Sequence, residues 1–278
     1  MKRIFLLLAG SASLALQAQE PERLQLWPGT DGTDAEIYVY HPTVKETTPA
    51  IVIFPGGGYQ GLAIDHEGHD MAKWYVANGF TAVVVKYRMP KGTHTIPLSD
   101  AEKAISTVRA NAAKWNIDPR KVGIIGSSAG GHLAASLSTL AADANRPNFA
   151  ILYYPVISFE DGVTHSGSKN NLLGADTGNS QLVERYTLEK QVDSKTPATL
   201  LLLSDDDQVV LPENSLRYYS ALKKAKIPAS MHIFPTGGHG WGFRPAFLYH
   251  EETKTLISKW LKEIKVSKAF GKKPDAAR

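Results

Sequence analysis

Six short apolar runs recur along the chain, at residues 50–54, 80–85, 122–125, 150–153, 199–203 and 230–234. These runs are rich in β-branched residues and almost free of polar breaks, which is typical of strands buried on both faces of a sheet. Amphipathic stretches separate them, at about 66–78, 98–115, 129–141 and 212–225, and a last one extends over about 246–266. The alternation predicts an α/β fold, with a mostly parallel central sheet and helices on both faces.

Three segments depart from this alternation. Residues 37–40 favour an early antiparallel strand. Residues 157–195 are polar and contain several glycines, which favours an insertion over the top of the sheet. Residues 267–278 are basic and rich in small residues, so we expect a solvated, disordered tail. A single domain is therefore predicted over residues 24–266.

The N-terminus has the pattern of a targeting segment. A basic start, Met1-Lys2-Arg3, precedes an apolar stretch over 4–16 and a small residue at Ala18. This pattern predicts a secretory signal peptide over 1–18 that is cleaved after Ala18, and hence export to the periplasm or the extracellular space. A buried N-terminal helix is the alternative. The apolar stretch is shorter than the ~20 residues that a membrane span requires.

Composition narrows the possible chemistry. With 43% hydrophobic and 21% charged residues, the chain is globular rather than disordered. It contains no cysteine, which excludes a disulfide scaffold, a thiolate metal site and a cysteine nucleophile. Removing Lys2 and Arg3 lowers the formal charge from +4 to +2, which is too small to indicate a nucleic-acid or membrane-surface partner.

A serine lies where a nucleophile would be expected. Gly126-Ser127-Ser128-Ala129-Gly130 matches the pattern G-x-S-x-G between a predicted strand and a predicted helix, the context that this motif requires. The glycines permit a sharp turn that pushes the Ser128 hydroxyl out above the sheet. The following helix adds free N–H groups and the positive end of its dipole. Ser128 is the predicted nucleophile and Ser127 is expected to be structural; a turn without chemistry is the alternative.

A serine nucleophile requires a base, and the base requires an acid that orients it. With this motif, the order along the chain is serine, acid, histidine. His239 lies in a glycine-rich loop after the 230–234 strand, where it has room to reach the serine, and is the predicted base. Three acids follow the 199–203 strand, namely Asp205, Asp206 and Asp207, and their position alone leaves all three open.

Glycines also follow the first buried strand. At this position they allow backbone N–H groups to point at a developing oxyanion, and the predicted donors are the N–H of Gly57 or Gly58 and that of Ala129. A phosphate loop is disfavoured because its lysine and Ser/Thr are missing. Tyr59 and Trp241 flank the two glycine-rich loops and are candidate substrate-binding residues, with core packing as the alternative.

Two further features are mostly discounted as chemistry. The histidines of 66–69 are three positions apart and lack the H-E-x-x-H zincin spacing, so no metal is expected. Glu67 and Asp70 are instead expected to serve the dipole at the start of a helix. His132 follows the nucleophile by one helical turn and is expected to pack beneath it, whereas His165 in the insertion is a candidate for facing the cleft.

Taken together, the sequence resembles the α/β-hydrolase superfamily and, within it, a bacterial carbohydrate-esterase-like branch often labelled acetyl xylan esterase or endo-β-1,4-xylanase B-like. The resemblance covers about residues 24–265, with matching segments at 55–68, 85–88, 126–133, 154–157, 170–174, 206–210 and 237–240. It implies the α/β-hydrolase fold. It also favours Asp207 as the acid, with Asp206 second, because 207–210 fits the D-x-x-V pattern of the family. The proline at 212, one position later than expected, is a small departure.

The resemblance implies an exported serine esterase that uses Ser128, Asp207 and His239 to deacetylate a polysaccharide or oligosaccharide through an acyl-enzyme. A feruloyl or general short-chain carboxylesterase is the alternative, because the sequence does not reveal the depth of the acyl pocket, and a peptidase is disfavoured. A glycosidase is also disfavoured, since it needs two carboxylates on opposite sides of the scissile bond. The expected partner is acetylated carbohydrate, and no cofactor, nucleic acid or membrane is expected.

Overall fold

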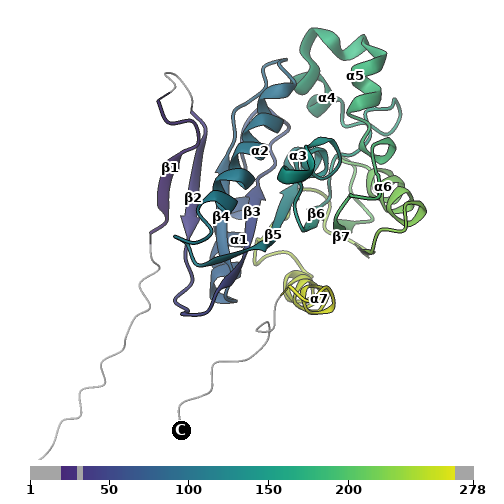
Figure 1. The fold of residues 1–278 in the computed structure, drawn as a ribbon. Helices are drawn as coiled ribbons and strands as arrows, with labels where there is room; N and C mark the ends of the chain where they lie inside the picture. Colours follow the sequence, from purple (N-terminus) through teal and green to yellow (C-terminus); the bar gives the residue numbers. More distant parts are fainter. Residues whose placement is uncertain (1–19, 30–33, 267–278) are drawn as a thin grey trace, which may run out of the picture.

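Eight strands form one sheet in the order β1-β2-β4-β3-β5-β6-β7-β8 in a computed structural model that describes residues 20–29 and 34–266 (Figure 1). The predicted signal peptide and basic tail lie outside the described residues. The strands are β1 (Glu22–Gln25), β2 (Glu36–Tyr40), β3 (Thr48–Phe54), β4 (Thr81–Lys86), β5 (Ile117–Ser127), β6 (Phe149–Tyr153), β7 (Ala198–Ser204) and β8 (Ala229–Phe234). All six strands predicted from the apolar runs are present; five of them are buried as predicted, whereas β8 lies at the edge of the sheet and only its Phe234 is buried.

The sheet is mostly parallel, as predicted. Strands β4, β3, β5, β6, β7 and β8 run parallel to their neighbours, whereas β2 pairs antiparallel with both β1 and β4. The predicted antiparallel strand over 37–40 is thus confirmed as β2. Strand β1 was not predicted, because its four residues alternate between partly buried and exposed positions and form no apolar run.

Helices cover both faces of the sheet. The longer helices are α1 (Asp70–Ala77), α2 (Thr95–Ala110), α3 (Ser128–Leu140), α6 (Glu213–Lys224) and α7 (His250–Glu263). One apolar core contains residues of α2, α3 and α6, and the other contains residues of α1 and α7. Alternate residues of the same strand enter different cores: Val52 packs in the first, and Ile51 and Ile53 pack in the second. This two-sided burial explains why the strands are nearly continuous apolar runs.

The segment 157–195 forms a cap of short elements above the sheet (Figure 1). They are α4 (Ser166–Leu173), α5 (Ser180–Arg185) and the 3-10 turns Gly174–Gly178 and Leu188–Lys190. The Asn171 side chain donates a hydrogen bond to the Gly58 carbonyl at 2.8 Å, and the Asn171 carbonyl accepts one from the Gly92 N–H at 3.1 Å. Because Gly58 and Gly92 follow β3 and β4, the cap lies over the carboxyl edge of the strands, as expected.

Three helix starts differ from the sequence prediction, and that of α7 lies four residues later than expected, at His250. A π-helical turn, Asp65–His69, precedes α1, so the amphipathic stretch at 66–78 is two segments rather than one. Helix α2 begins three residues earlier than expected, because Pro97 lies in its first turn, where a missing N–H costs no helical hydrogen bond. Within the described ranges, no helix is long and apolar enough to cross a membrane.

Candidate active site

The predicted chemical groups converge at one edge of the sheet. Ser128 begins α3 directly after β5, Asp207 follows β7, His239 follows β8, and the glycine loop 55–58 follows β3. All four strands run parallel, so their carboxyl ends lie at the same edge. Ligands of open α/β sheets bind at this edge. The fold therefore brings together residues that are more than 180 positions apart in the sequence.

The turn at Ser128 has the geometry of a nucleophile elbow. Ser128 has φ 54°, a left-handed conformation that is costly for a residue with a side chain. A Cβ atom at Gly126 would lie 2.2 Å from the Gly130 carbonyl oxygen, and one at Gly130 would lie 2.1 Å from the Phe54 carbonyl oxygen. Only glycine fits at these two positions. The hydroxyl of the neighbouring Ser127 is buried and finds no hydrogen-bond partner among the described residues.

The serine, the histidine and one aspartate form a continuous hydrogen-bonded chain. The Nε2 atom of His239 lies 2.8 Å from the Ser128 Oγ, and its Nδ1 lies 2.7 Å from the Asp207 Oδ2. The other oxygen of Asp207, Oδ1, accepts hydrogen bonds from the N–H groups of Val209 at 2.9 Å and Val210 at 3.0 Å. Asp207 is only 1% exposed, so these three donors define its orientation.

The competing acids have other partners. Asp206 accepts hydrogen bonds from the N–H groups of Gly238 at 2.7 Å and Gly237 at 3.3 Å, and so holds the histidine loop from outside. Asp205 is exposed, and its carboxylate makes no hydrogen bond within the described part of the chain. The geometry thus distinguishes the three aspartates that their position in the sequence left open.

The glycine loop after β3 has two backbone N–H groups that find no acceptor among the described residues. Gly57 has φ 132° and Gly58 has φ 64°, conformations that a residue with a side chain rarely adopts. The Gly57 carbonyl accepts hydrogen bonds from the N–H groups of Gln60 and Gly61. No atom of the described residues accepts a hydrogen bond from the N–H of Gly57 or Gly58. A Cβ atom at Gly56 would lie 2.9 Å from the Ser128 Cβ, which places this loop directly beside the elbow.

A buried carboxylate beside the glycine loop was missed as part of the site. Glu67 is 2% exposed, and its Oε2 accepts a hydrogen bond from the Gly56 N–H at 2.7 Å. Its Oε1 accepts one from the Tyr154 hydroxyl at 2.7 Å. Glu67 does lie in the first turn of a helical segment, as expected, but its carboxylate also bonds the glycine loop and Tyr154, which was not predicted. The available signal was its place in the 55–68 segment of the resemblance, since no local pattern predicts a contact with Tyr154.

The two aromatic residues that flank the loops lie in the protein interior. Tyr59 is 2% exposed, and its hydroxyl is hydrogen-bonded to the Nδ1 of His132 at 3.0 Å. Trp241 is 4% exposed, donates its indole N–H to the Ser204 Oγ at 3.0 Å and stacks on Phe247. The core-packing alternative therefore describes both rings, and we assign neither to the substrate-binding surface. Their size made a pocket position plausible, but their polar atoms are already bonded within the protein.

His132 packs beneath the elbow, as expected. It is fully buried, stacks on Phe159 with ring centroids 4.5 Å apart, and is hydrogen-bonded through Nε2 to the Tyr186 carbonyl. Burial lowers the pKa of His132 from 6.5 to about 4. His165 lies near the candidate site: burial lowers its pKa, the nearby His239 lowers it further, and Asp207 opposes the shift. The insertion thus brings one imidazole close to the predicted base and acid.

Among the described residues, no set of metal ligands surrounds the histidine pair at 66 and 69. The Nδ1 of His69 is hydrogen-bonded to the Tyr40 hydroxyl at 2.8 Å. The carbonyl of His66 accepts the N–H of Phe243 at 2.8 Å. Within the described ranges, no three or more acidic or histidine side chains are placed to hold a metal ion.

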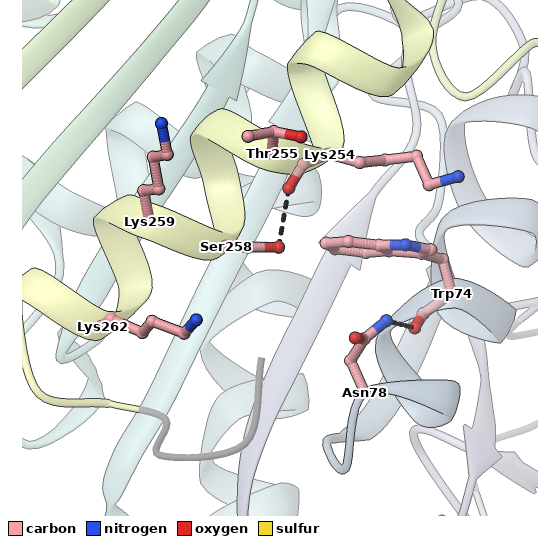
Figure 2. A pocket seen from close by; sticks show the side chains of 7 residues that line it. All are labelled: Trp74, Asn78, Lys254, Thr255, Ser258, Lys259 and Lys262. Carbon is pink, nitrogen blue, oxygen red and sulfur yellow. Dashed lines mark hydrogen bonds between the residues drawn. The ribbon is translucent and has the colours of Figure 1, made fainter. Parts of the chain in front are cut away.

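Of the hollows in the described part of the protein, two bear on the position of the candidate site, and one of them is lined by Gly61 and Leu62, which follow the glycine loop. A cavity of about 550 Å³ is lined by Gly61, Leu62 and residues that follow β4, including Tyr87, Met89 and Lys91. The other, of about 310 Å³, lies between α1 and α7 (Figure 2). It is lined by Trp74, Asn78, Lys254, Thr255, Ser258, Lys259 and Lys262. None of these seven residues belongs to the elbow, the glycine loop or the histidine loop, so this hollow is separate from the candidate site.

A Ser–His–Asp arrangement at the carboxyl edge of such a sheet is the hallmark of the α/β-hydrolase class. A solved structure agrees with this assignment. The acetyl ester-xyloside bifunctional hydrolase from Caldicellulosiruptor lactoaceticus superposes with a TM-score of 0.84 and 36% sequence identity, covering 91% of this chain and 99% of that one. The α/β-hydrolase fold predicted from the sequence is confirmed.

Within this class, the chain belongs to the BD-FAE family, whose profile matches residues 36–222. An acetylxylan esterase from Xylanibacter ruminicola is 39% identical over 259 residues, which are 92% of this chain and 54% of that protein. An endo-1,4-beta-xylanase B from Butyrivibrio fibrisolvens is 36% identical over an alignment of 218 residues that covers 73% of this chain and 34% of that protein. The chain therefore spans about half or less of the length of these two relatives.

Proposed function

We propose that the protein is a serine esterase in which Ser128 is the nucleophile, His239 the general base and Asp207 the orienting acid. The observation that carries this proposal is the hydrogen-bonded chain from Asp207 through His239 to Ser128. An acid that fixes the tautomer of the histidine, and a histidine within hydrogen-bond reach of the serine, are the parts that serine acyl transfer requires. We also propose the N–H groups of Gly57, Gly58 and Ala129 as the oxyanion donors.

The proposed reaction has two steps. The Ser128 Oγ attacks the ester carbonyl while His239 takes the serine proton at Nε2, and the oxyanion that forms is stabilised by the backbone N–H groups. The tetrahedral intermediate collapses, the alcohol leaves with the proton from His239, and an acyl group remains on Ser128. Water, deprotonated by the same imidazole, then attacks this acyl group. Carboxylic acid is released and the serine regains its proton.

We propose an acetylated xylan or xylo-oligosaccharide as the substrate. The supporting observations are the names of the relatives, an acetylxylan esterase and an acetyl ester-xyloside hydrolase, and their 39% and 36% identity to this chain. Action on a plant polysaccharide also requires export, so we retain the proposals of a signal peptide over 1–18 and a hydrolase domain over 24–266.

A glycosidase activity is the second candidate, because the solved relative is described as hydrolysing a xyloside as well as an acetyl ester. A substrate panel separates the candidates: acetylated xylan, 4-nitrophenyl acetate and butyrate, methyl ferulate and 4-nitrophenyl xyloside. We expect acetate release from xylan and preference for the acetyl over the butyryl ester, both lost in Ser128→Ala. Turnover of the xyloside that survives in Ser128→Ala would indicate a second site, and turnover of methyl ferulate alone would overturn the acetyl assignment.

A further inference from the structure

One buried carboxylate contacts the two loops on which the proposed reaction depends. Glu67 lies in the π-helical turn Asp65–His69, away from the triad in sequence, and its Oε2 accepts the Gly56 N–H at 2.7 Å. Gly56 directly precedes the two residues whose N–H groups are the proposed oxyanion donors. Any shift of this carboxylate therefore moves the backbone that carries those donors.

The other oxygen of Glu67 reaches the histidine loop through a tyrosine. The Tyr154 hydroxyl donates to the Glu67 Oε1 at 2.7 Å and accepts the N–H of Gly242 at 2.7 Å. Burial, together with the nearby carboxylate, raises the pKa of the Tyr154 hydroxyl well above its ordinary value, so this hydroxyl is a donor. The tyrosine ring meets His239 edge-on, with ring centroids 4.7 Å apart. A single chain of hydrogen bonds thus runs from Gly56 to Gly242.

The packing around this chain leaves little freedom. A Cβ atom at Gly56 would lie 2.6 Å from the Glu67 Oε2, and one at Gly242 would lie 2.8 Å from the Glu67 Cγ. Tyr154 itself has φ 34°, a left-handed conformation that its surroundings must hold in place. Both loops therefore rest against the same side chain.

Packing alone does not explain why the side chain at position 67 is a carboxylate. Within the described residues, the Glu67 carboxylate accepts hydrogen bonds from the neutral donors of Gly56 and Tyr154, and it forms no ion pair. Burying a charged group without an opposite charge is costly, and an apolar side chain of similar size would avoid this cost. What a carboxylate offers is two acceptors in a fixed geometry, one for each loop.

We propose that Glu67 is a positioning residue, which acts through Gly56 and Tyr154 to set the oxyanion donors and His239 at the spacing that the transition state requires. This inference rests on the proposed esterase function. Because the oxyanion donors bond the substrate oxygen more strongly in the transition state than in the ground state, a displaced loop lowers kcat more than it changes KM.

Two variants and one matched control test the proposal. Glu67→Gln keeps the shape, but the amide nitrogen cannot accept a hydrogen bond, so one of the two loops loses its acceptor. Tyr154→Phe removes the link to Gly242 and leaves the contact with Gly56. The control is Tyr153→Phe: this neighbouring tyrosine is equally buried, and its hydroxyl has no hydrogen-bond partner in the part of the chain that the structure describes.

The readout is kcat and KM for 4-nitrophenyl acetate, expressed per active site as titrated with a fluorophosphonate. We expect Glu67→Gln to lower kcat by about 10- to 100-fold, with KM changed by less than about 3-fold. Tyr154→Phe should lower kcat as well, and the double variant should lose less than the product of the two single losses, since both break one chain. Tyr153→Phe should match the unmodified protein.

Titration per active site separates a positioning role from a loss of folded protein. An unchanged kcat in Glu67→Gln, including one accompanied by a raised KM, would overturn the inference. If Glu67→Gln does not fold, Tyr154→Phe decides, and an unchanged kcat in that variant has the same meaning. If the unmodified protein hydrolyses no ester at all, the proposed function fails, whereas an active protein that is insensitive at Glu67 refutes only the positioning role.

Discussion

Asp207→Asn is the substitution for which the structure predicts the effect most sharply. The carboxylate is held from two sides, since Oδ1 accepts the N–H groups of Val209 and Val210 while Oδ2 faces the Nδ1 of His239. An asparagine in this place keeps its oxygen toward the two backbone donors, because the flipped amide would set its NH₂ group against both of them. The amide NH₂ therefore faces His239.

This orientation determines the size of the effect. An NH₂ group that donates to Nδ1 requires the histidine tautomer with its proton on Nε2, and that proton then points at the Ser128 Oγ, 2.8 Å away. The imidazole can no longer take the serine proton. In serine proteases, the equivalent change lowers kcat by about 10⁴-fold with intact geometry. This loss corresponds to about 5.5 kcal/mol of transition-state stabilisation at about 1.36 kcal/mol per factor of ten.

The assay is hydrolysis of 4-nitrophenyl acetate by Asp207→Asn, with Asp205→Asn as the matched control. Asp205 is exposed and forms no hydrogen bond through its carboxylate within the described residues, so its amide variant should retain full turnover. Circular dichroism should show the same thermal transition for both variants and the unmodified protein. Turnover above about one tenth in Asp207→Asn, or an equal loss in Asp205→Asn, would refute the reasoning.

Two predictions concern stability. Asp100 is fully buried, and its ion pair with Arg88 has an N···O distance of 2.6 Å. Asp100→Ala leaves the partly buried guanidinium of Arg88 without its partner. This variant should therefore lower the free energy of unfolding, measured in urea, by about 3 kcal/mol. Asp118→Ala, whose partner is exposed, should cost less than about 1 kcal/mol; equal losses would contradict the burial argument. His132 has a folded-state pKa of about 4 against 6.5 when unfolded, so the unfolded chain binds the extra proton between these values. The free energy of unfolding should therefore fall as the pH drops from 6.5 to 4, with about 3 kcal/mol of this fall due to His132. Urea titrations of His132→Gln should show a smaller fall over the same pH range. If the pH dependence of the free energy of unfolding is the same in this variant, the lowered pKa of His132 is excluded as its cause.

Much of the fold could be predicted because its signals are local. A strand buried on both faces, such as β3, must be apolar throughout, and the G-x-S-x-G turn must have glycines where a side chain would collide with the backbone. The order of serine, acid and histidine follows from the order of the strands. Each of these features depends on short segments of neighbouring residues, so it can be predicted from the sequence alone.

The parts that could not be predicted depend on packing between distant segments. The contact of Glu67 with Tyr154 joins residues 87 positions apart, and only the folded protein brings them together. Tyr59 and Trp241 lie beside functional loops in the sequence, but their rings turn inward because the core behind each loop has room for them. Adjacency along the chain says which loop a side chain belongs to, and not which side of that loop it occupies.

The central claim is that Ser128 carries the acyl group, and labelling tests it most directly. The protein is treated with a fluorophosphonate, which reacts with activated serines, and the modified peptide is located by mass spectrometry. The account predicts one adduct at Ser128 that is absent in Ser128→Ala, which loses ester hydrolysis by several powers of ten, about 10⁶-fold in the comparable case of subtilisin. Ser127→Ala should keep both the adduct and the activity. An adduct at Ser127, or hydrolysis that persists in Ser128→Ala, would contradict the account.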